Sequence, residues 1–206
     1  MSITTLRIKC YSVIPYRQLL RPFLNEIKYG RTIELKKCLD SLILENSFKT
    51  FLGNMPIFIP CPRSSPRKKD AVWPSQSIVT ELLGRVDDSS IEEVIERATA
   101  VPKSAFCISN ERPTISIHFA SLNVEARTTI PQNANLIIVD DFITKGATTA
   151  ACYKQLKQIY PGATVKVLSL FRSNYNSITT PDCKYHPCNG EINIDDSGLS
   201  VVIHQE

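Results

Sequence analysis

The sequence predicts an α/β fold in which a mostly parallel sheet is flanked by helices. Residues 136–139 form a short, uninterrupted aliphatic run, which is typical of a strand covered on both faces in a parallel sheet. Stretches with apolar residues at helical spacing lie on both sides of that run. The length of 206 residues suits a single domain over residues 1–206 with a substantial core.

The first half of the chain is expected to supply helices that cover the sheet. Two stretches, residues 16–29 and 33–51, carry apolar side chains at helical spacing. Residues 55–60 then predict a strand, and residues 75–83 and 90–97 predict two more helices. Between the strand and the first of these helices lies a proline-rich basic loop, residues 61–70. Its polar side chains include Arg63, Ser64, Arg67 and Lys68.

Residues 98–116 lack a clean periodicity and contain Lys103 and Arg112 between prolines. Structureless loops longer than ~12–15 residues are uncommon unless they are functional. We therefore expect a flexible lid with these two basic donors, and a surface hairpin is the alternative. His118, which follows, is expected to be a half-buried histidine with its hydrogen bonds satisfied rather than a catalytic base.

Residues 135–149 carry the most specific pattern: a strand, two carboxylates, a glycine-bearing loop and a helix start. Asp140 and Asp141 follow the aliphatic run, at the strand end where open α/β sheets place their ligands. Residues 144–148 can surround an anion with backbone N–H groups, because Gly146 permits a positive φ at the start of a helix over 147–160. The loop suits a phosphate, and the carboxylates suit the two hydroxyls of a ribose.

Other interpretations of this pattern fit less well. Phospho-acceptor receiver domains carry an acidic pair on their first strand, whereas this pair lies two thirds of the way along the chain. A nucleotide-hydrolysing P-loop needs Gly-x-x-x-x-Gly-Lys-Ser/Thr, which the sequence lacks. A solvated turn after a strand is the remaining alternative.

Residues 137–148, with aliphatic positions, two acids and Thr-x-Gly-x-Thr, resemble the phosphoribosyl-pyrophosphate (PRPP) loop of type I phosphoribosyltransferases. The resemblance implies the type I phosphoribosyltransferase fold and Mg²⁺ as cofactor. It also implies that Asp140 and Asp141 are catalytic and metal-binding residues. It implies a PRPP site made of Asp140, Asp141, Thr144, Lys145, Gly146, Ala147 and Thr148. Lys145 departs from the family pattern, in which Thr or Gly is commoner.

The basic loop adds to this reading. If its strand runs parallel to 136–139, its positive charge lies at the same sheet edge as the acidic pair, where it suits a pyrophosphate. The predicted pyrophosphate contacts are Arg63, Ser64, Arg67 and Lys68, and a solvated basic loop is the alternative.

A second resemblance joins the first half of the chain to this family. Residues 24–31, Leu-Asn-Glu-Ile-Lys-Tyr-Gly-Arg, and the Pro-Cys-Pro at 60–62 resemble ComF-type competence-associated proteins, in which a Lys-Tyr element precedes a Pro-x-Pro pyrophosphate loop. The chain departs from that group at residues 71–76, where Arg-Gly-Phe-Asn-Gln is usual, and in lacking the amino-terminal zinc finger. It resembles a divergent ComF-type relative.

The last part of the chain is expected to complete the sheet and a hood. Residues 163–171 predict a strand, and the resemblance implies that Phe171, Arg172 and Ser173 contact the base, with core packing as the alternative for Phe171. Residues 175–206 are expected to form a small hood or hairpin, with strands at 190–194 and 199–203.

The whole-chain composition favours some classes of protein over others. A net charge of +4 without a block of like charges favours an anionic small ligand over a dedicated nucleic-acid surface. Seven scattered cysteines and no signal peptide favour reduced thiols and a cytoplasmic location. No apolar run approaches the roughly 18 residues of a membrane helix. Cys183, His186 and Cys188 offer only three zinc ligands, so an ordinary turn is preferred there.

Two functions remain. The leading hypothesis is a Mg²⁺-dependent phosphoribosyltransferase that binds PRPP and an unidentified base or amine acceptor and releases pyrophosphate. The alternative is a non-catalytic PRPP- or nucleotide-binding accessory protein of the ComF type, linked to DNA uptake or processing. Single-stranded DNA and a second copy of the chain are its candidate partners.

Overall fold

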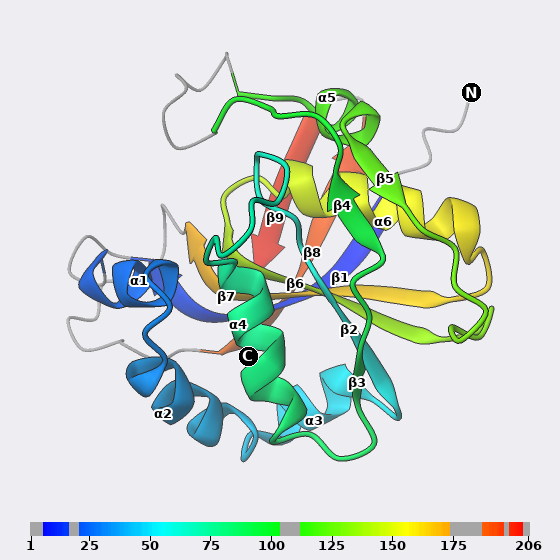
Figure 1. The fold of residues 1–206 in the computed structure, drawn as a ribbon. Helices are drawn as coiled ribbons and strands as arrows, with labels where there is room; N and C mark the ends of the chain where they lie inside the picture. Colours follow the sequence, from blue (N-terminus) through cyan, green and yellow to red (C-terminus); the bar gives the residue numbers. More distant parts are fainter. Residues whose placement is uncertain (1–5, 17–20, 104–111, 174–186, 196–197, 204–206) are drawn as a thin grey trace.

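A seven-stranded sheet forms the centre of the protein (Figure 1). The computed structural model describes residues 6–16, 21–103, 112–173, 187–195 and 198–203. The strands across the sheet are β3 (Ser90–Ile91), β2 (Pro56–Pro60), β6 (Asn135–Ile143), β7 (Thr164–Ser173), β1 (Leu6–Tyr16), β8 (Cys188–Asp195) and β9 (Gly198–Ile203). The first five run parallel, and β8 and β9 are antiparallel to their neighbours. The predicted α/β fold with a mostly parallel sheet is confirmed.

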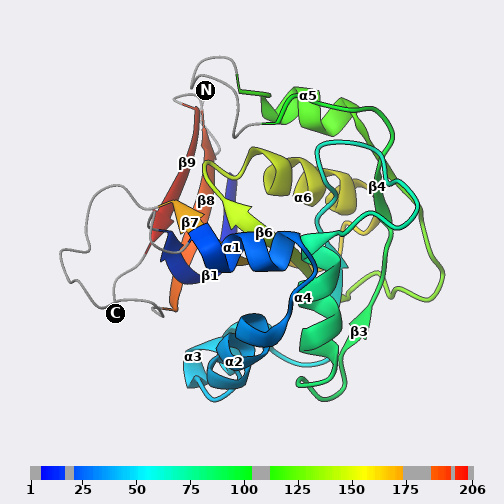
Figure 2. The same cartoon turned by 60° about the vertical axis from the view of Figure 1, so that its left-hand side comes forward.

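Helices cover both faces of this sheet (Figure 2). One face carries α1 (Arg21–Lys28), α2 (Ile33–Leu42), α3 (Asn46–Leu52) and α4 (Pro74–Leu83). The other carries α5 (Ile115–Ala120) and α6 (Ala147–Ile159). Successive residues of β6 point to opposite faces, so Ile138 packs under α6 while Ile137 and Val139 pack under the other layer. This burial on both faces explains the continuous aliphatic run.

The predicted helix over 90–97 is wrong. The segment forms β3 and β4 (Ile95–Arg97), and β4 pairs with β5 (Leu122–Val124) in a small antiparallel sheet. Ile91, Val94 and Ile95 have helical spacing, but Ile91 pairs with Phe58 at the edge of the main sheet. Such short apolar runs do not distinguish helix from strand, and here strand pairing decided the outcome.

Three other boundaries differ from the prediction. The helix expected over 33–51 is two helices, because Glu45 has an extended backbone (φ −70°, ψ 123°) between α2 and α3. The helix expected from residue 16 begins at Arg21 in the described chain, and residue 16 ends β1 instead. Strand β6 continues to Ile143, so Asp140 and Asp141 lie within the strand.

The predicted carboxy-terminal hairpin is present as β8 and β9, and it joins the edge of the central sheet beside β1. The expected lid lies partly outside the described residues, which omit 104–111. Its first part is tied down, since the Val101 N–H donates to the Ser64 carbonyl at 2.7 Å. No helix in the described ranges has the length and apolar character needed to cross a bilayer.

Candidate functional site

A cavity of about 590 Å³ lies at the carboxyl end of β6, and it is called here the acid-pair cavity. It collects residues from four parts of the chain: β6 with the turn and helix start that follow, the start of the basic loop, α1, and Arg112 before α5. These include Asp140, Asp141, Thr144, Gly146, Ala147, Thr148, Arg63 and Ser64. The sheet order places β2 next to β6, so the two loops meet at one edge as the sequence predicted.

The Asp140 carboxyl group of the cavity is unfavourably placed for carrying a negative charge. The Asp141 N–H donates to Asp140 Oδ1 at 2.9 Å. Burial, and then the neighbouring charge of Asp141, raises the pKa of Asp140 well above its usual range. Because two adjacent anions repel each other, this pair would be relieved by a cation or by hydroxyl donors from a ligand.

Next to the acid pair, the turn into α6 forms an anion-binding geometry. Gly146 has φ 81° and precedes the first residue of α6, and its carbonyl accepts from the Ala150 N–H at 2.8 Å. The first N–H groups of a helix lack partners within the helix and carry the positive end of its dipole. Thr144, Ala147 and Thr148 line the cavity beside this turn. Lys145 is exposed and its side chain is not among the lining residues.

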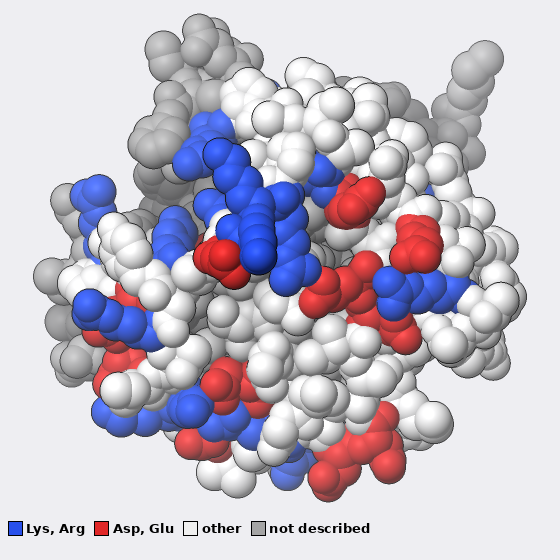
Figure 3. All heavy atoms as spheres, viewed as in Figure 1, with Lys and Arg blue, Asp and Glu red and all other residues white. Residues whose placement is uncertain are grey.

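The basic loop divides between two cavities. Arg63 and Ser64 line the acid-pair cavity, whereas Arg67 and Lys68 line an adjoining cavity of about 750 Å³ that also includes Arg63. Figure 3 shows Lys and Arg side chains gathered on this face of the molecule. The four predicted pyrophosphate contacts therefore lie side by side, but only two of them share a cavity with the acid pair.

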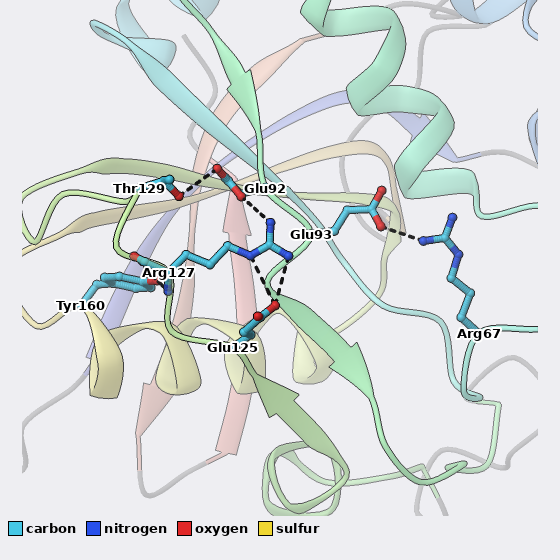
Figure 4. Close-up of polar contacts among 7 residues, drawn as sticks. All are labelled: Arg67, Glu92, Glu93, Glu125, Arg127, Thr129 and Tyr160. Carbon is cyan, nitrogen blue, oxygen red and sulfur yellow. Dashed lines mark hydrogen bonds and ion pairs between the residues drawn. The ribbon is translucent and has the colours of Figure 1, made fainter.

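Arg67 has protein partners of its own. Its Nη1 atom lies 2.7 Å from Glu93 Oε2 (Figure 4), and its guanidinium lies 5.1 Å from the centre of the Trp73 ring. The Trp73 Nε1–H in turn donates to the Cys61 carbonyl at 2.8 Å. Residues 71–76, where the chain departs from the ComF pattern, thus fold back onto the end of β2.

A polar network fixes the small β4–β5 sheet to the main sheet. Arg127, which follows β5, pairs with Glu92 at 2.9 Å and with Glu125 at 3.1 Å. The backbone N–H of Arg127 donates to the hydroxyl of Tyr160, which follows α6, at 2.8 Å (Figure 4). This network holds one wall of the adjoining cavity, which Ile95 lines from β4.

The predicted lid residues lie on different cavities. Lys103 lines the adjoining cavity and Arg112 lines the acid-pair cavity. The Arg112 Nε atom is buried and has no hydrogen-bond partner among the residues that the structure describes. This donor lies beside the acid pair, in a position to donate to an anionic or hydroxyl-bearing ligand.

His118 was expected to be half-buried, and the structure places it in the core at 2% exposure. Its Nε2 lies 3.4 Å from Thr148 Oγ1, and its Nδ1 lies 3.5 Å from Arg97 Nη2. Burial, and then the charge of Arg97, lowers the pKa of His118 to about 4. The imidazole is therefore neutral at physiological pH. The histidine also contacts Thr148 at the start of α6, which the sequence did not predict.

The three residues predicted to contact a base lie elsewhere. Phe171 is buried and packs on Phe23, with ring centres 5.3 Å apart. Arg172 is 2% exposed and donates to the Ser12 carbonyl at 3.2 Å. Ser173 donates to the Thr144 carbonyl at 3.3 Å and so contacts the turn that precedes α6. None of the three is among the described residues that line the acid-pair cavity.

Sequence reasoning missed four polar residues of the site. Helix α1 presents Arg21, Asn25 and Lys28 to the acid-pair cavity, and the buried Arg97 at the end of β4 lines the adjoining cavity. The spacing of 21, 25 and 28 could have indicated one helix face. No sequence pattern marked Arg97, which ends a segment that was expected to be helical.

The donor set of the acid pair fits Mg²⁺ better than a softer metal. Mg²⁺ is held by one or two carboxylates together with ligand oxygens, and Asp140 and Asp141 supply two adjacent carboxylates. Among the described residues no group of three or more Cys, His, Asp or Glu side chains is placed to hold a metal by itself. Of the trio considered for zinc, residues 183 and 186 lie outside the described residues, and Cys188 is a buried free thiol.

A scan against protein-family models and a search of curated proteins both found no match. Solved structures with a similar fold include an adenine phosphoribosyltransferase from Saccharomyces cerevisiae, crystallised with an imino-altritol bisphosphate and adenine. It is 19% identical over 69% of this chain and 71% of that chain, with a TM-score of 0.44.

Two further structures are similar at lower identity. A hypoxanthine phosphoribosyltransferase from Staphylococcus aureus is 13% identical over 79% of this chain and 69% of that chain, with a TM-score of 0.37. An adenine phosphoribosyltransferase from Leishmania donovani is 10% identical over 74% of this chain and 72% of that chain, with a TM-score of 0.35. These likenesses are distant in sequence and in shape.

Proposed function

We propose that this protein is a PRPP-binding phosphoribosyltransferase that transfers the phosphoribosyl group to a nitrogen acceptor and releases pyrophosphate. The observation that supports this most is the meeting of the acid pair and the Gly146 turn in one cavity at the end of β6. A sugar phosphate needs an anion site and a pair of hydroxyl acceptors at close quarters.

The proposed ligand extends across the cavity. Its 5-phosphate lies at the turn of residues 144–148, and the ribose hydroxyls donate to Asp140 and Asp141. Its pyrophosphate lies toward Arg63 and Ser64, with Arg67 and Lys68 across the boundary of the adjoining cavity and Lys103 and Arg112 beside them. The Lys145 N–H belongs to the phosphate turn, although its side chain is exposed.

The reaction needs positioning and charge stabilisation rather than a covalent nucleophile. The bond between the ribose C1 and the pyrophosphate oxygen breaks, and its electron pair leaves with the pyrophosphate. The acceptor nitrogen forms the new bond to C1 with its lone pair and loses its proton to solvent. The carboxylates favour the positive charge that develops on the ribose, and Arg63 favours the charge on the leaving group. Mg²⁺, when bound, neutralises the pyrophosphate as a Lewis acid.

Isothermal titration calorimetry with PRPP, with and without Mg²⁺, tests this proposal. The Asp140→Asn/Asp141→Asn double variant should lose saturable binding. The matched control is Asp87→Asn/Asp88→Asn. It replaces two exposed aspartates that are adjacent to each other in the chain and lie outside the acid-pair cavity. Binding that survives in the first variant would refute the site. Where binding is established, pyrophosphate release with a panel of bases and amines identifies the acceptor.

The alternative is a PRPP- or nucleotide-binding accessory protein without turnover. The contacts of Arg67 in the basic loop support it. Arg67 is paired with Glu93 and lies on Trp73, so it is held by the protein. This second function predicts PRPP binding without pyrophosphate release, together with salt-dependent binding of single-stranded DNA to the basic face, by the chain alone or by a homodimer. Fluorescence anisotropy with a labelled single strand at low and high salt measures the DNA binding. Sedimentation then shows whether the single chain or a homodimer binds the strand.

A further inference from the structure

A buried chain of polar contacts connects β4 to the phosphate turn through α5. Arg97, at the end of β4, is 4% exposed, and its Nη2 faces His118 Nδ1 at 3.5 Å. On the other side of the imidazole, Nε2 faces Thr148 Oγ1 at 3.4 Å. Thr148 lines the acid-pair cavity. One row of three side chains thus runs from the core to the proposed phosphate site.

The chemistry of these three groups fixes where the protons are. A guanidinium donates hydrogen bonds and accepts none, so His118 Nδ1 must be the acceptor in the contact with Arg97. A neutral imidazole with an accepting Nδ1 carries its proton on Nε2. The Nε2–H therefore donates to Thr148 Oγ1, and the hydroxyl proton of Thr148 must be directed to another acceptor.

The same arginine also contacts the basic loop. Its Nε–H donates to the Arg63 carbonyl at 2.9 Å, and its Nη1 donates to the His118 carbonyl at 3.3 Å and to the Ser121 hydroxyl. All of these acceptors are neutral, and no carboxylate pairs with Arg97 among residues that the structure describes. A buried cation without a counter-ion is costly, so its retention is better explained by a role than by stability.

We propose that Arg97 and His118 are positioning residues for phosphate binding: Arg97 holds the imidazole as the Nε2–H tautomer, and the imidazole leaves the Thr148 hydroxyl free to donate to a ligand phosphate. This rests on the proposed function, because it takes residues 144–148 as the phosphate turn. Through the Arg63 carbonyl, the same guanidinium keeps the basic loop in a fixed position relative to that turn. One buried residue therefore sets both anion-binding elements of the site.

The tautomer can be measured without any ligand. The chain has three histidines, so ¹⁵N-labelled histidine and long-range ¹H–¹⁵N correlation spectra are tractable, and the His118→Gln variant assigns the His118 signals. We expect His118 to be protonated on Nε2 alone at neutral pH. Protonation on Nδ1 would overturn the proposal whatever the ligand-binding result.

The functional part is tested with ribose 5-phosphate, with ribose as the control that lacks the phosphate. His118→Leu removes the imidazole and should weaken ribose 5-phosphate binding about tenfold, the effect of one hydrogen bond to a charged group. Thr148→Val should have a similar effect. The double variant should bind no more weakly than Thr148→Val alone, because His118 acts on the ligand only through the Thr148 hydroxyl, which Thr148→Val already removes. His118→Gln, which restores a donor near the Nε2 position, should recover most of the affinity.

A purely structural role for His118 predicts different results. Gln155→Leu is the matched control, since Gln155 donates to the Phe119 and Leu122 carbonyls and so joins α6 to α5 and β5 without contacting Thr148. It should lower thermal stability and leave ribose 5-phosphate affinity unchanged. Losses that add up in the double variant, or a Gln155→Leu variant that binds as weakly as His118→Leu, would refute the positioning role.

The test separates this inference from the proposed function. A wild-type protein that binds neither ribose 5-phosphate nor PRPP refutes the proposed function and the phosphate role together. PRPP binding that is lost in Asp140→Asn/Asp141→Asn but unaffected in Thr148→Val supports the proposed function and refutes the inference alone.

Discussion

The side chain of Ile192 lies directly against Gly146. A methyl group placed on the Gly146 Cα would lie 3.0 Å from Ile192 Cγ2 and 3.1 Å from its Cδ1. Ile192 belongs to β8 and is fully buried, so the carboxy-terminal hairpin supports the turn that begins α6. A segment that was expected to act as a hood or edge therefore also packs against the turn of residues 144–148, the proposed phosphate site.

Gly146→Ala should be damaging to both stability and binding. The residue has φ 81°, which side chains rarely adopt, and the added methyl group meets a buried isoleucine. We expect the free energy of unfolding to fall by about 1–3 kcal/mol and PRPP affinity to be lost. Urea denaturation and calorimetry measure the two effects. Gly84→Ala is the control, because Gly84 has φ −75° and its nearest neighbour to an added Cβ is 4.0 Å away. A Gly146→Ala protein that matched this control would contradict the account.

Asp140→Asn should stabilise the ligand-free protein at neutral pH while abolishing Mg²⁺-dependent PRPP binding. The raised pKa of Asp140 means that the folded state holds its proton more tightly than the unfolded state. The contribution of this group to stability is therefore fully present below the unfolded carboxyl pKa and is lost as pH rises through the folded value. The Asn variant retains the Oδ1 acceptor for the Asp141 N–H and has no charge to repel Asp141.

Thermal unfolding of the wild type and of Asp140→Asn across the pH range measures this effect. The advantage of the variant should grow as the pH rises from acidic to neutral. A wild type that is the more stable of the two at neutral pH would show that Asp140 is not held in an unfavourable charged state in the absence of ligand.

The part of the site that could be predicted from sequence is local in the chain. Asp140, Asp141 and Gly146 follow one another within seven residues, and a single strand, turn and helix place them. Their order alone indicates a buried strand end beside a helix amino terminus. The start of the basic loop lies at the predicted sheet edge as well, because parallel neighbouring strands end at the same edge, although only Arg63 and Ser64 of its four predicted contacts line the acid-pair cavity.

The parts that could not be predicted depend on contacts between distant segments. Arg97 reaches Thr148 only through His118, and these residues are joined by the packing of α5 on α6. At the end of β7, residues were expected at the ligand that are not there. Phe171 and Arg172 were placed near a ligand by resemblance, but the packing of α1 and β1 buries them. Strand β1 itself was not predicted, although it lies between β7 and β8 in the sheet.

Lys145→Ala should have little effect on ligand binding, in contrast to Arg112→Ala. The Lys145 side chain is exposed and does not line the acid-pair cavity, whereas Arg112 lines it with a buried Nε that has no hydrogen-bond partner within the described part of the chain. We expect a change of no more than about twofold for Lys145→Ala and a loss of about tenfold or more for Arg112→Ala. Calorimetric titration of both variants with PRPP decides this. A large loss in Lys145→Ala would mean that its side chain turns toward the ligand on binding.

His118 should make the protein sensitive to mild acid. Its folded pKa of about 4 lies below the ordinary value of 6.5, so the folded state favours the neutral imidazole. The stability that depends on this group is fully present above the unfolded pKa and is lost as pH falls toward the folded value. Between neutral pH and about pH 5, the free energy of unfolding of the wild type should fall by roughly 1–2 kcal/mol more than that of His118→Gln. Denaturant unfolding of both proteins at the two pH values measures this difference. Parallel pH dependence in the two proteins would show that His118 titrates normally and is not held between Arg97 and Thr148 in the way that the structure describes.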